Sequence, residues 1–391
     1  MFNQFPKTVA LLCSAICAPF ALADVNGGGA TLPQPLYQTP GVLTAGFAPY
    51  IGVGSGAGKA AFLNNDYSKF VPGDTSKNVH WAASESKLTH AELNNYVAGH
   101  GATWGPLIQI PSAATSIAIP FNKVGTANVN LSVVQLCGIF SGRLTDWSQI
   151  NGAGRTGAIT VVYPQGSSGT TELFTRFLNA KCANEPWGTF AITTNFASSF
   201  SGGLPANAIS ANRSQDIMNA VNQAQGRITY MSPAYAAPTL AGLDDATKVA
   251  RIAGVSPTPA NVSNAIAAVP VPATANRSNP RAWVPVFAAT TNPNDPSVVA
   301  FPTTGYPILG FTNLILSQCY ADPTQSTQVR SFITRHYGAL AINNNDSVIT
   351  ANRFVPLPAT WKTTVRSSFL TATNALSIGN PNVCNGIGRP L

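Results

Sequence analysis

A short run of hydroxyl and glycine residues, Ser168-Gly169-Thr170, directly precedes an amphipathic stretch of this sequence. The apolar residues that follow it recur at helical spacing, namely Leu173, Phe174, Phe177 and Leu178. This pattern predicts a helix that begins at the run. The first N–H groups of a helix lack backbone partners and lie at the positive end of the helix dipole. Such a helix start can bind an anion, although an ordinary Ser/Thr cap would have the same sequence.

Two segments upstream have the same character. A glycine-rich loop at residues 26–33 carries Thr31 and Leu32 just before a predicted helix, where they can offer N–H groups and a hydroxyl to an anion. A predicted strand at residues 50–53 is followed by Ser55, and the glycines and lysine around this serine do not have P-loop spacing. Ligands of α/β sheets bind where strands end and helices begin. Three such segments therefore favour one shared anion cleft.

Glu85 follows another predicted strand, in a chain that has only 14 acidic residues. Its position makes Glu85 a candidate ligand-binding residue of the same cleft. The ordinary alternative is that Glu85 is an acidic residue of a solvated loop. The next helix is indicated by Thr89 and Glu92, which have the spacing of a capping box.

Residues for metal-dependent catalysis are sparse. The sequence contains four histidines: His80, His90, His100 and His336. None has the spacing of metal ligands, and no G-x-S-x-G motif is present. We therefore predict no metal, no cofactor and no dedicated catalytic residue. An alkaline phosphatase activity would have to use the cleft itself, with Ser168 or Thr170 as the hydroxyl and Glu85 as the base.

The composition is that of an exported protein. Charged residues make up 9% of the 391 residues, against roughly 25% in typical proteins, and the formal net charge of +8 is spread without a Lys/Arg run. This argues against nucleic-acid binding. Residues 1–23 resemble a signal peptide, with a basic start, an apolar stretch and a cleavage site at Ala23. No later apolar run approaches the ~18 residues of a membrane span, so we expect a periplasmic or secreted protein without membrane insertion.

Four cysteines follow the predicted signal peptide: Cys137, Cys182, Cys319 and Cys384. In an oxidising compartment they suggest two disulfides, for which three pairings are possible. Pairing of sequence neighbours would crosslink each half of the chain separately, but the sequence alone does not fix the pairing.

Predicted strands and helices alternate along the chain, which favours an α/β protein with mixed or parallel sheets flanked by helices. Its length favours two domains. We expect the chain to cross to a second lobe near the apolar strands at residues 107–122. The apolar strand at 306–316 would return it. Lobe I would thus comprise residues 24–112 and 307–391, and lobe II residues 113–306, with a Pro-, Asn- and Thr-rich connecting excursion at 255–306.

The sequence also resembles a known family over essentially its whole mature length. The matching stretches are residues 24–33, residues 50–56, SSGTTELFTRFLNAKC at 167–182, GRITYMSP at 226–233, YPILGFTNLIL at 306–316 and the tail at 378–386. They resemble the DING proteins, a branch of the periplasmic phosphate-binding proteins with secreted members described as low-molecular-weight alkaline phosphatases.

This resemblance implies a two-lobe, type II periplasmic-binding fold that clamps phosphate or a related oxyanion between its lobes. The implied phosphate-binding residues are Thr31, Leu32, Ser55, Glu85, Ser168, Gly169 and Thr170. The resemblance also implies disulfides between Cys137 and Cys182 and between Cys319 and Cys384. As partners it suggests a phosphate ABC permease or a secretion system, expressed during phosphate starvation. We expect the protein to be a monomer.

Two charged positions of the family pattern are changed here. Glu85 stands where the family has an aspartate that accepts the proton of hydrogen phosphate. Pro164 stands where the family has an arginine, four residues before Ser168, and Arg143 and Arg155 are the candidates to replace its charge. We expect weaker phosphate binding or a changed ligand. The alternatives are ordinary phosphate binding through the remaining neutral donors, a secreted phosphatase, and an extracellular interaction protein.

Overall fold

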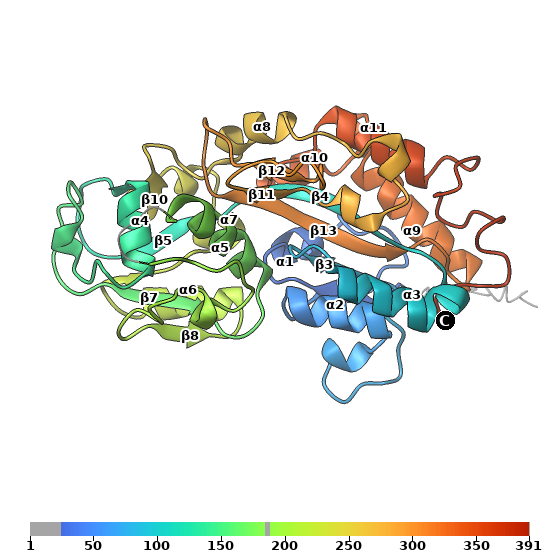
Figure 1. Cartoon of the computed structure of the whole chain (residues 1–391), viewed down its shortest axis with the longest axis horizontal. Coiled ribbons are helices and arrows are strands. Elements are labelled where there is room, and N and C mark those ends of the chain that lie inside the picture. Colours follow the sequence, from blue (N-terminus) through green and yellow to red (C-terminus); the bar gives the residue numbers. More distant parts are fainter. Residues whose placement is uncertain (1–24, 184–187, 391) are drawn as a thin grey trace, which may run out of the picture.

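The computed structural model describes residues 25–183 and 188–390, so the predicted signal peptide and its cleavage site lie outside the described residues. The chain forms two α/β halves that lie side by side (Figure 1). One half contains a five-stranded sheet and the other a six-stranded sheet. Both sheets carry helices, as predicted. In the described part of the chain, no helix is long and apolar enough to cross a membrane.

The five-stranded sheet has the order β2-β1-β3-β13-β4. Its strands are β1 (Gly27–Gly29), β2 (Ile51–Gly52), β3 (Trp81–Ser84), β4 (Leu107–Ser116) and β13 (Leu309–Ser317). β1 pairs in parallel with β2 and β3, whereas β13 is antiparallel to β3 and β4. The helices of this half are α1 (Gln34–Gln38), α2 (Ser55–Asn64), α3 (His90–Trp104), α9 (Pro323–His336), α10 (Asp346–Ala351) and α11 (Ala359–Phe369). α3 begins at the predicted capping box, in which Thr89 Oγ1 accepts from the Glu92 amide.

The six-stranded sheet has the order β6-β10-β5-β9-β7-β8 and is also mixed. Its strands are β5 (Ile119–Asn122), β6 (Asn130–Leu131), β7 (Thr160–Pro164), β8 (Ile209–Ala211), β9 (Arg227–Ile228) and β10 (Val249–Ile252). Its helices are α4 (Val133–Phe140), α5 (Gly169–Lys181), α6 (Ser214–Asn222) and α7 (Pro233–Ala236). The strand predicted around residues 226–231 is shorter than expected. Beyond β9 it continues only as an isolated bridge between Met231 and Ala118.

Residues 255–306 form more than a connecting excursion. They contain α8 (Pro259–Ala267), a 3₁₀ turn (Pro280–Trp283) and a parallel ribbon of β11 (Val286–Ala288) and β12 (Val298–Ala300). In Figure 1 this segment lies over β4 and β13 of the five-stranded sheet. Two contacts agree with this placement: the Trp361 indole of α11 donates to the Val269 carbonyl at 3.0 Å, and the Phe287 ring stacks on Phe311 of β13.

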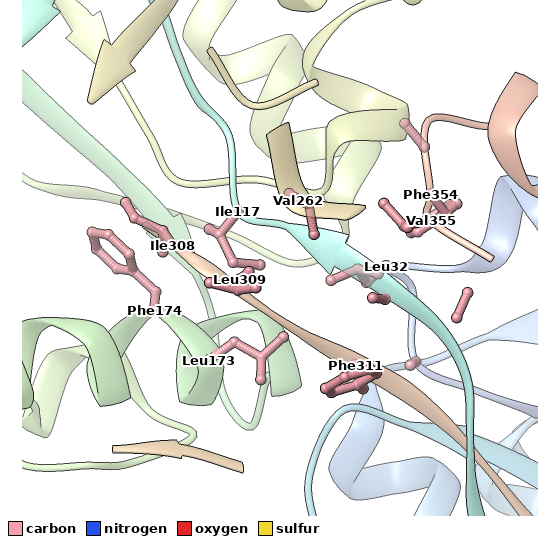
Figure 2. Close-up of a cluster of buried hydrophobic side chains, with 14 of the residues drawn as sticks. Leu32, Ile117, Leu173, Phe174, Val262, Ile308, Leu309, Phe311, Phe354 and Val355 are labelled. Atoms are coloured by element: carbon pink, nitrogen blue, oxygen red, sulfur yellow. The ribbon is translucent and has the colours of Figure 1, made fainter. Parts of the chain in front are cut away.

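A single apolar cluster runs through both halves. Figure 2 shows the part of it where Leu173 and Phe174 of α5 lie beside Ile308 and Leu309, at the start of β13. Apolar burial is the main stabilising contribution in folded proteins. The helix that carries the predicted anion site is therefore held in place by packing against the other half of the molecule.

Two disulfides complete the framework. Cys137 in α4 is bonded to Cys182 at the end of α5, and Cys319 after β13 is bonded to Cys384 in the C-terminal tail. These are the pairs that the resemblance implies. Each crosslink joins residues within one half of the molecule.

Candidate functional site

The predicted ligand residues converge on one small cleft between the two sheets, with a volume of about 50 Å³. It lies where strands end and helices begin: β1 leads to Thr31, β2 to α2, β3 to Glu85 and β7 to α5. The residues that line it are Thr31, Val53, Gly54, Ser55, Glu85, Pro164, Gln165, Ser167, Ser168, Gly169, Thr170, Asn212, Ser214, Ile217, Tyr230 and Met231. Of the seven predicted residues, only Leu32 does not line this space.

The start of α5 forms one wall of the cleft. Ser168 is its N-cap, and the Ser168 hydroxyl accepts from the Thr171 amide at 3.3 Å. The amides of Gly169 and Thr170 have no hydrogen-bond partner within residues 25–183 and 188–390. They are therefore available to an anion, and the dipole of this 13-residue helix favours negative charge at that point.

Gly169 is required by the close approach of the two walls. A Cβ atom at this position would lie 2.3 Å from Ser55 Oγ and 2.5 Å from Glu85 Oε2. No larger residue fits unless these groups move. The walls thus meet at Gly169 in a closed arrangement.

The opposite wall comes from the loop after β1 and from the start of α2. The Thr31 hydroxyl lies 3.0 Å from the Ser214 hydroxyl at the start of α6, so this contact joins the two halves. The Leu32 side chain is buried, and its carbonyl accepts from Ser232 at 3.0 Å. The amides of Thr31 and Leu32 lack partners in the described part of the chain, so they too can donate to a ligand.

Glu85 is buried at the base of the cleft, with both carboxylate oxygens hydrogen-bonded. Oε2 accepts from the Ser55 hydroxyl at 2.7 Å and Oε1 from the Thr312 hydroxyl at 3.0 Å. Burial raises the pKa of Glu85 to about 7, although these two hydrogen bonds oppose the shift. Glu85 is therefore not the solvated loop acid of the ordinary alternative, and it titrates near neutral pH.

No cation replaces the family arginine among the described residues that line the cleft. Pro164 ends β7 and contributes only an apolar surface. Arg155 cannot compensate, because its guanidinium donates to the carbonyls of Lys123, Gly125, Ala127 and Ala153. Arg143 does not line the cleft either. Among the described residues that line the cleft, Glu85 is thus the one carboxylic acid.

Sequence reasoning missed several polar residues of the site, among them Asn212 and Ser214, which line the cleft, and Thr312, which hydrogen-bonds Glu85. Asn212 and Ser214 lie where β8 leads into α6, a strand-to-helix junction of the kind recognised elsewhere in the chain. That junction is the signal that could have found them. Thr312 lies within β13, 227 residues from Glu85, and has no local signal.

Cationic residues gather in a second, outer pocket, which shares Ser167 with the cleft. Each of three cations there is paired with an acid: Lys59 with Glu92, Lys87 with Asp295, and Arg176 with Glu172. The fourth cation, Arg281, donates to the Leu88 carbonyl. Among the described residues of the outer pocket, three cations are thus neutralised by acids, and Arg281 is directed to a backbone carbonyl.

Two of the four histidines, His80 and His336, are buried and hydrogen-bonded. His80 Nδ1 accepts from the Asn26 amide, and His336 lies against Ser112. Burial lowers the pKa of both imidazoles to about 4. Within the residues that the structure describes, no group of three or more His, Cys, Asp or Glu residues could hold a metal ion.

Comparison with known proteins places the chain in a family. The family model of the PBP superfamily domain matches residues 38–334. "Alkaline phosphatase L" of Pseudomonas aeruginosa (strain UCBPP-PA14) is 70% identical in an alignment of 394 positions that covers 100% of both chains. A "Phosphate-binding protein" of an unknown prokaryotic organism is 64% identical over 94% of this chain and all of its own.

Solved structures agree. The chain superimposes with a TM-score of 0.91 on a high-affinity periplasmic phosphate-binding protein bound with phosphate at pH 8.5, with 68% identity over 94% of this chain and all of the other. A crystal structure of a DING protein gives the same TM-score at 65% identity and the same coverage. The two-lobe fold, the converging strand ends and these relatives show that the chain belongs to the PBP superfamily and, within it, to the DING proteins.

Proposed function

We propose that this protein is an extracytoplasmic solute-binding protein that captures inorganic phosphate or a related oxyanion between its two lobes. The observation that carries the proposal is the convergence of unpaired amides and hydroxyls on one closed cleft. Amides at a helix start and neutral hydroxyls are groups that hold tetrahedral oxyanions. The relative solved with bound phosphate is 68% identical and supports the same ligand class.

The donors that we propose are the hydroxyl and amide of Thr31, the Leu32 amide, the hydroxyls of Ser55, Ser168 and Thr170, and the amides of Gly169 and Thr170. Glu85 would be the one carboxyl group beside the ligand among the described residues. A cleft of about 50 Å³ accommodates a small ion such as free phosphate. This size supports capture of the free ion.

Isothermal titration of the ligand-stripped mature protein with phosphate, and then with sulfate, tests this proposal. We expect saturable binding of phosphate with one site per chain. A folded protein that gives no heat with either anion at any pH would contradict it and would favour an extracellular interaction protein.

A phosphatase is the second candidate, because full-length relatives carry that name and the Glu85 carboxylate accepts a hydrogen bond from the Ser55 hydroxyl. Release of phosphate from a chromogenic monoester, measured on protein from which trace phosphatases have been removed, tests it. Turnover that Ser55→Ala and Glu85→Gln abolish would establish hydrolysis in the cleft. Turnover unaffected by both changes would assign it to a contaminant.

The domain boundaries are also a proposal. We infer that lobe I contains residues 24–112 and 307–391, as the sequence suggests. β4 extends to Ser116 within the five-stranded sheet, and α8 and β11–β12 pack beside β4 and β13. These contacts support adding residues 113–116 and 259–306 to lobe I. Periplasmic location or secretion after cleavage near Ala23, a monomeric state, and a permease or secretion-system partner complete the proposal.

A further inference from the structure

The Glu85 carboxylate lies next to two groups that we propose as donors to the anion, the Ser55 hydroxyl and the Gly169 amide. Its Oε2 accepts from the Ser55 hydroxyl at 2.7 Å, and the same oxygen lies 2.5 Å from the position of a Cβ atom on Gly169, at the start of α5. Ser55 and Gly169 are two of the groups that would hold the oxyanion. The ionised carboxylate is therefore a negative group of the protein itself, placed beside the ligand's donors.

The charges in and around the cleft strengthen the repulsion between ionised Glu85 and a bound oxyanion. Ionised Glu85 and a doubly charged oxyanion would place three negative charges in a buried space whose described lining contains no cation. Like charges in a medium of low polarity repel strongly. If Glu85 is neutral and the oxyanion carries one charge, a single negative charge remains for the amides and hydroxyls to stabilise.

The groups that face Glu85 do not neutralise its negative charge. Ser55 from α2 and Thr312 from β13 are neutral, and Gly169 from α5 presents backbone. The titratable groups that act on Glu85 or share its cleft are Glu172 on α5, the buried phenols of Tyr37 and Tyr50, and Tyr230. The cations Lys59, Lys87, Arg176 and Arg281 line the outer pocket instead. Lys59, Lys87 and Arg176 are paired with acids, and the negative charge of Glu172 acts against ionisation of Glu85.

We propose that Glu85 competes with the oxyanion when ionised, so that capture of the anion is coupled to uptake of one proton by Glu85. Protonation removes the competing charge, frees the Ser55 hydroxyl for the ligand and provides an O–H donor. The preferred ligand is then a singly charged oxyanion such as dihydrogen phosphate. This inference rests on the proposed function.

The test compares the mature wild-type protein with Glu85→Gln, which mimics the neutral carboxyl. Phosphate is titrated at pH 6 and pH 8, in pairs of buffers with different ionisation enthalpies. Protons taken up by phosphate itself are common to both proteins and cancel in the comparison. We expect the wild type to take up about one proton more than the variant at pH 8. The ratio of wild-type Kd to variant Kd should rise about tenfold between the two pH values, since only the neutral fraction of Glu85 binds.

Asp244→Asn is the control, because it removes an exposed acid that does not line the cleft. It should keep the proton uptake of the wild type. A Kd ratio that stays constant with pH and equal proton uptake in the two proteins would overturn the inference while leaving phosphate capture intact. Absence of phosphate binding in both folded proteins at every pH would overturn the proposed function as well. Thermal unfolding of Glu85→Gln confirms that the variant is folded.

Discussion

Leu173 of α5 lies directly over Gly310 of β13. A Cβ atom placed on Gly310 would be 2.5 Å from Leu173 Cδ2 and 3.1 Å from Leu173 Cγ. The helix whose start lines the cleft thus approaches the opposite sheet to a distance that only glycine permits. Binding geometry and core packing are linked at this contact, because Leu173 lies one turn from Gly169.

We predict that Gly310→Ala displaces the start of α5. The added methyl group overpacks a buried contact, which typically costs about 1–3 kcal/mol, and phosphate affinity should fall together with stability. Urea unfolding and isothermal titration measure the two effects. The double variant Gly310→Ala, Leu173→Ala restores the space, so the two changes should couple non-additively. Full affinity and stability in Gly310→Ala would show that α5 is not held by this contact.

Gly169→Ala should act on the cleft more directly. Its methyl group would meet Ser55 Oγ and Glu85 Oε2, so the closed arrangement cannot form around a ligand. We expect phosphate affinity to fall by at least about tenfold, which corresponds to about 1.4 kcal/mol. Gly99→Ala is the control, since a methyl group there meets nothing within 4 Å and alanine favours a helix. If the Gly169→Ala variant binds phosphate as tightly as the Gly99→Ala control, the start of α5 is not part of the phosphate site.

Pro164→Arg should strengthen phosphate binding at pH 8. The substitution places a cation in a lining whose described residues include none, and a hydrogen bond to a charged group contributes about 1.5–3 kcal/mol. We expect roughly ten- to a hundredfold tighter binding, measured by titration. Pro164→Gln removes the proline without adding charge and should not reproduce the gain. An equal gain in both variants would assign the effect to the loss of proline.

The unliganded protein should lose stability as the pH rises. The pKa of Glu85 is raised from 4.5 to about 7 in the folded state, so the folded protein binds this proton more tightly than the unfolded chain. Ionisation of Glu85 therefore costs stability, which falls between about pH 4.5 and 7 and stays low above that range.

Glu85→Gln removes this contribution. We expect the difference in free energy of unfolding between variant and wild type to grow by up to about 3 kcal/mol from pH 4 to pH 8. Chemical denaturation of the two proteins over this range measures it. A difference that does not change with pH would mean that Glu85 has an ordinary pKa in the folded protein.

Local chemistry accounts for most of what the sequence predicted correctly. The capping residues Ser168 and Thr89 each satisfy an amide a few residues away, so their roles are readable from spacing alone. Thr312 and Ser214 depend on which strand lies beside which. Their partners are 227 and 183 residues distant, and no local pattern encodes such contacts.

Residues 255–306 contain more regular structure than their composition predicts, because a segment rich in proline and asparagine is typical of loops. Their structure comes from tertiary contacts instead. The β11–β12 ribbon and the 3₁₀ turn at Pro280–Trp283 acquire their place by packing on elements far away in sequence. The apolar pattern in this stretch is too short to predict that arrangement.

The same segment touches both lobes. Asp295 pairs with Lys87 beside the Glu85 loop, and the Phe301 ring packs edge-on against Phe177 of α5 at a centroid distance of 5.4 Å. Because residues 259–306 pack with lobe I, separation of the lobes would break the Phe301–Phe177 contact and leave the Lys87–Asp295 pair intact. Opening would expose these two buried rings to water, so their contact favours the closed arrangement of the cleft.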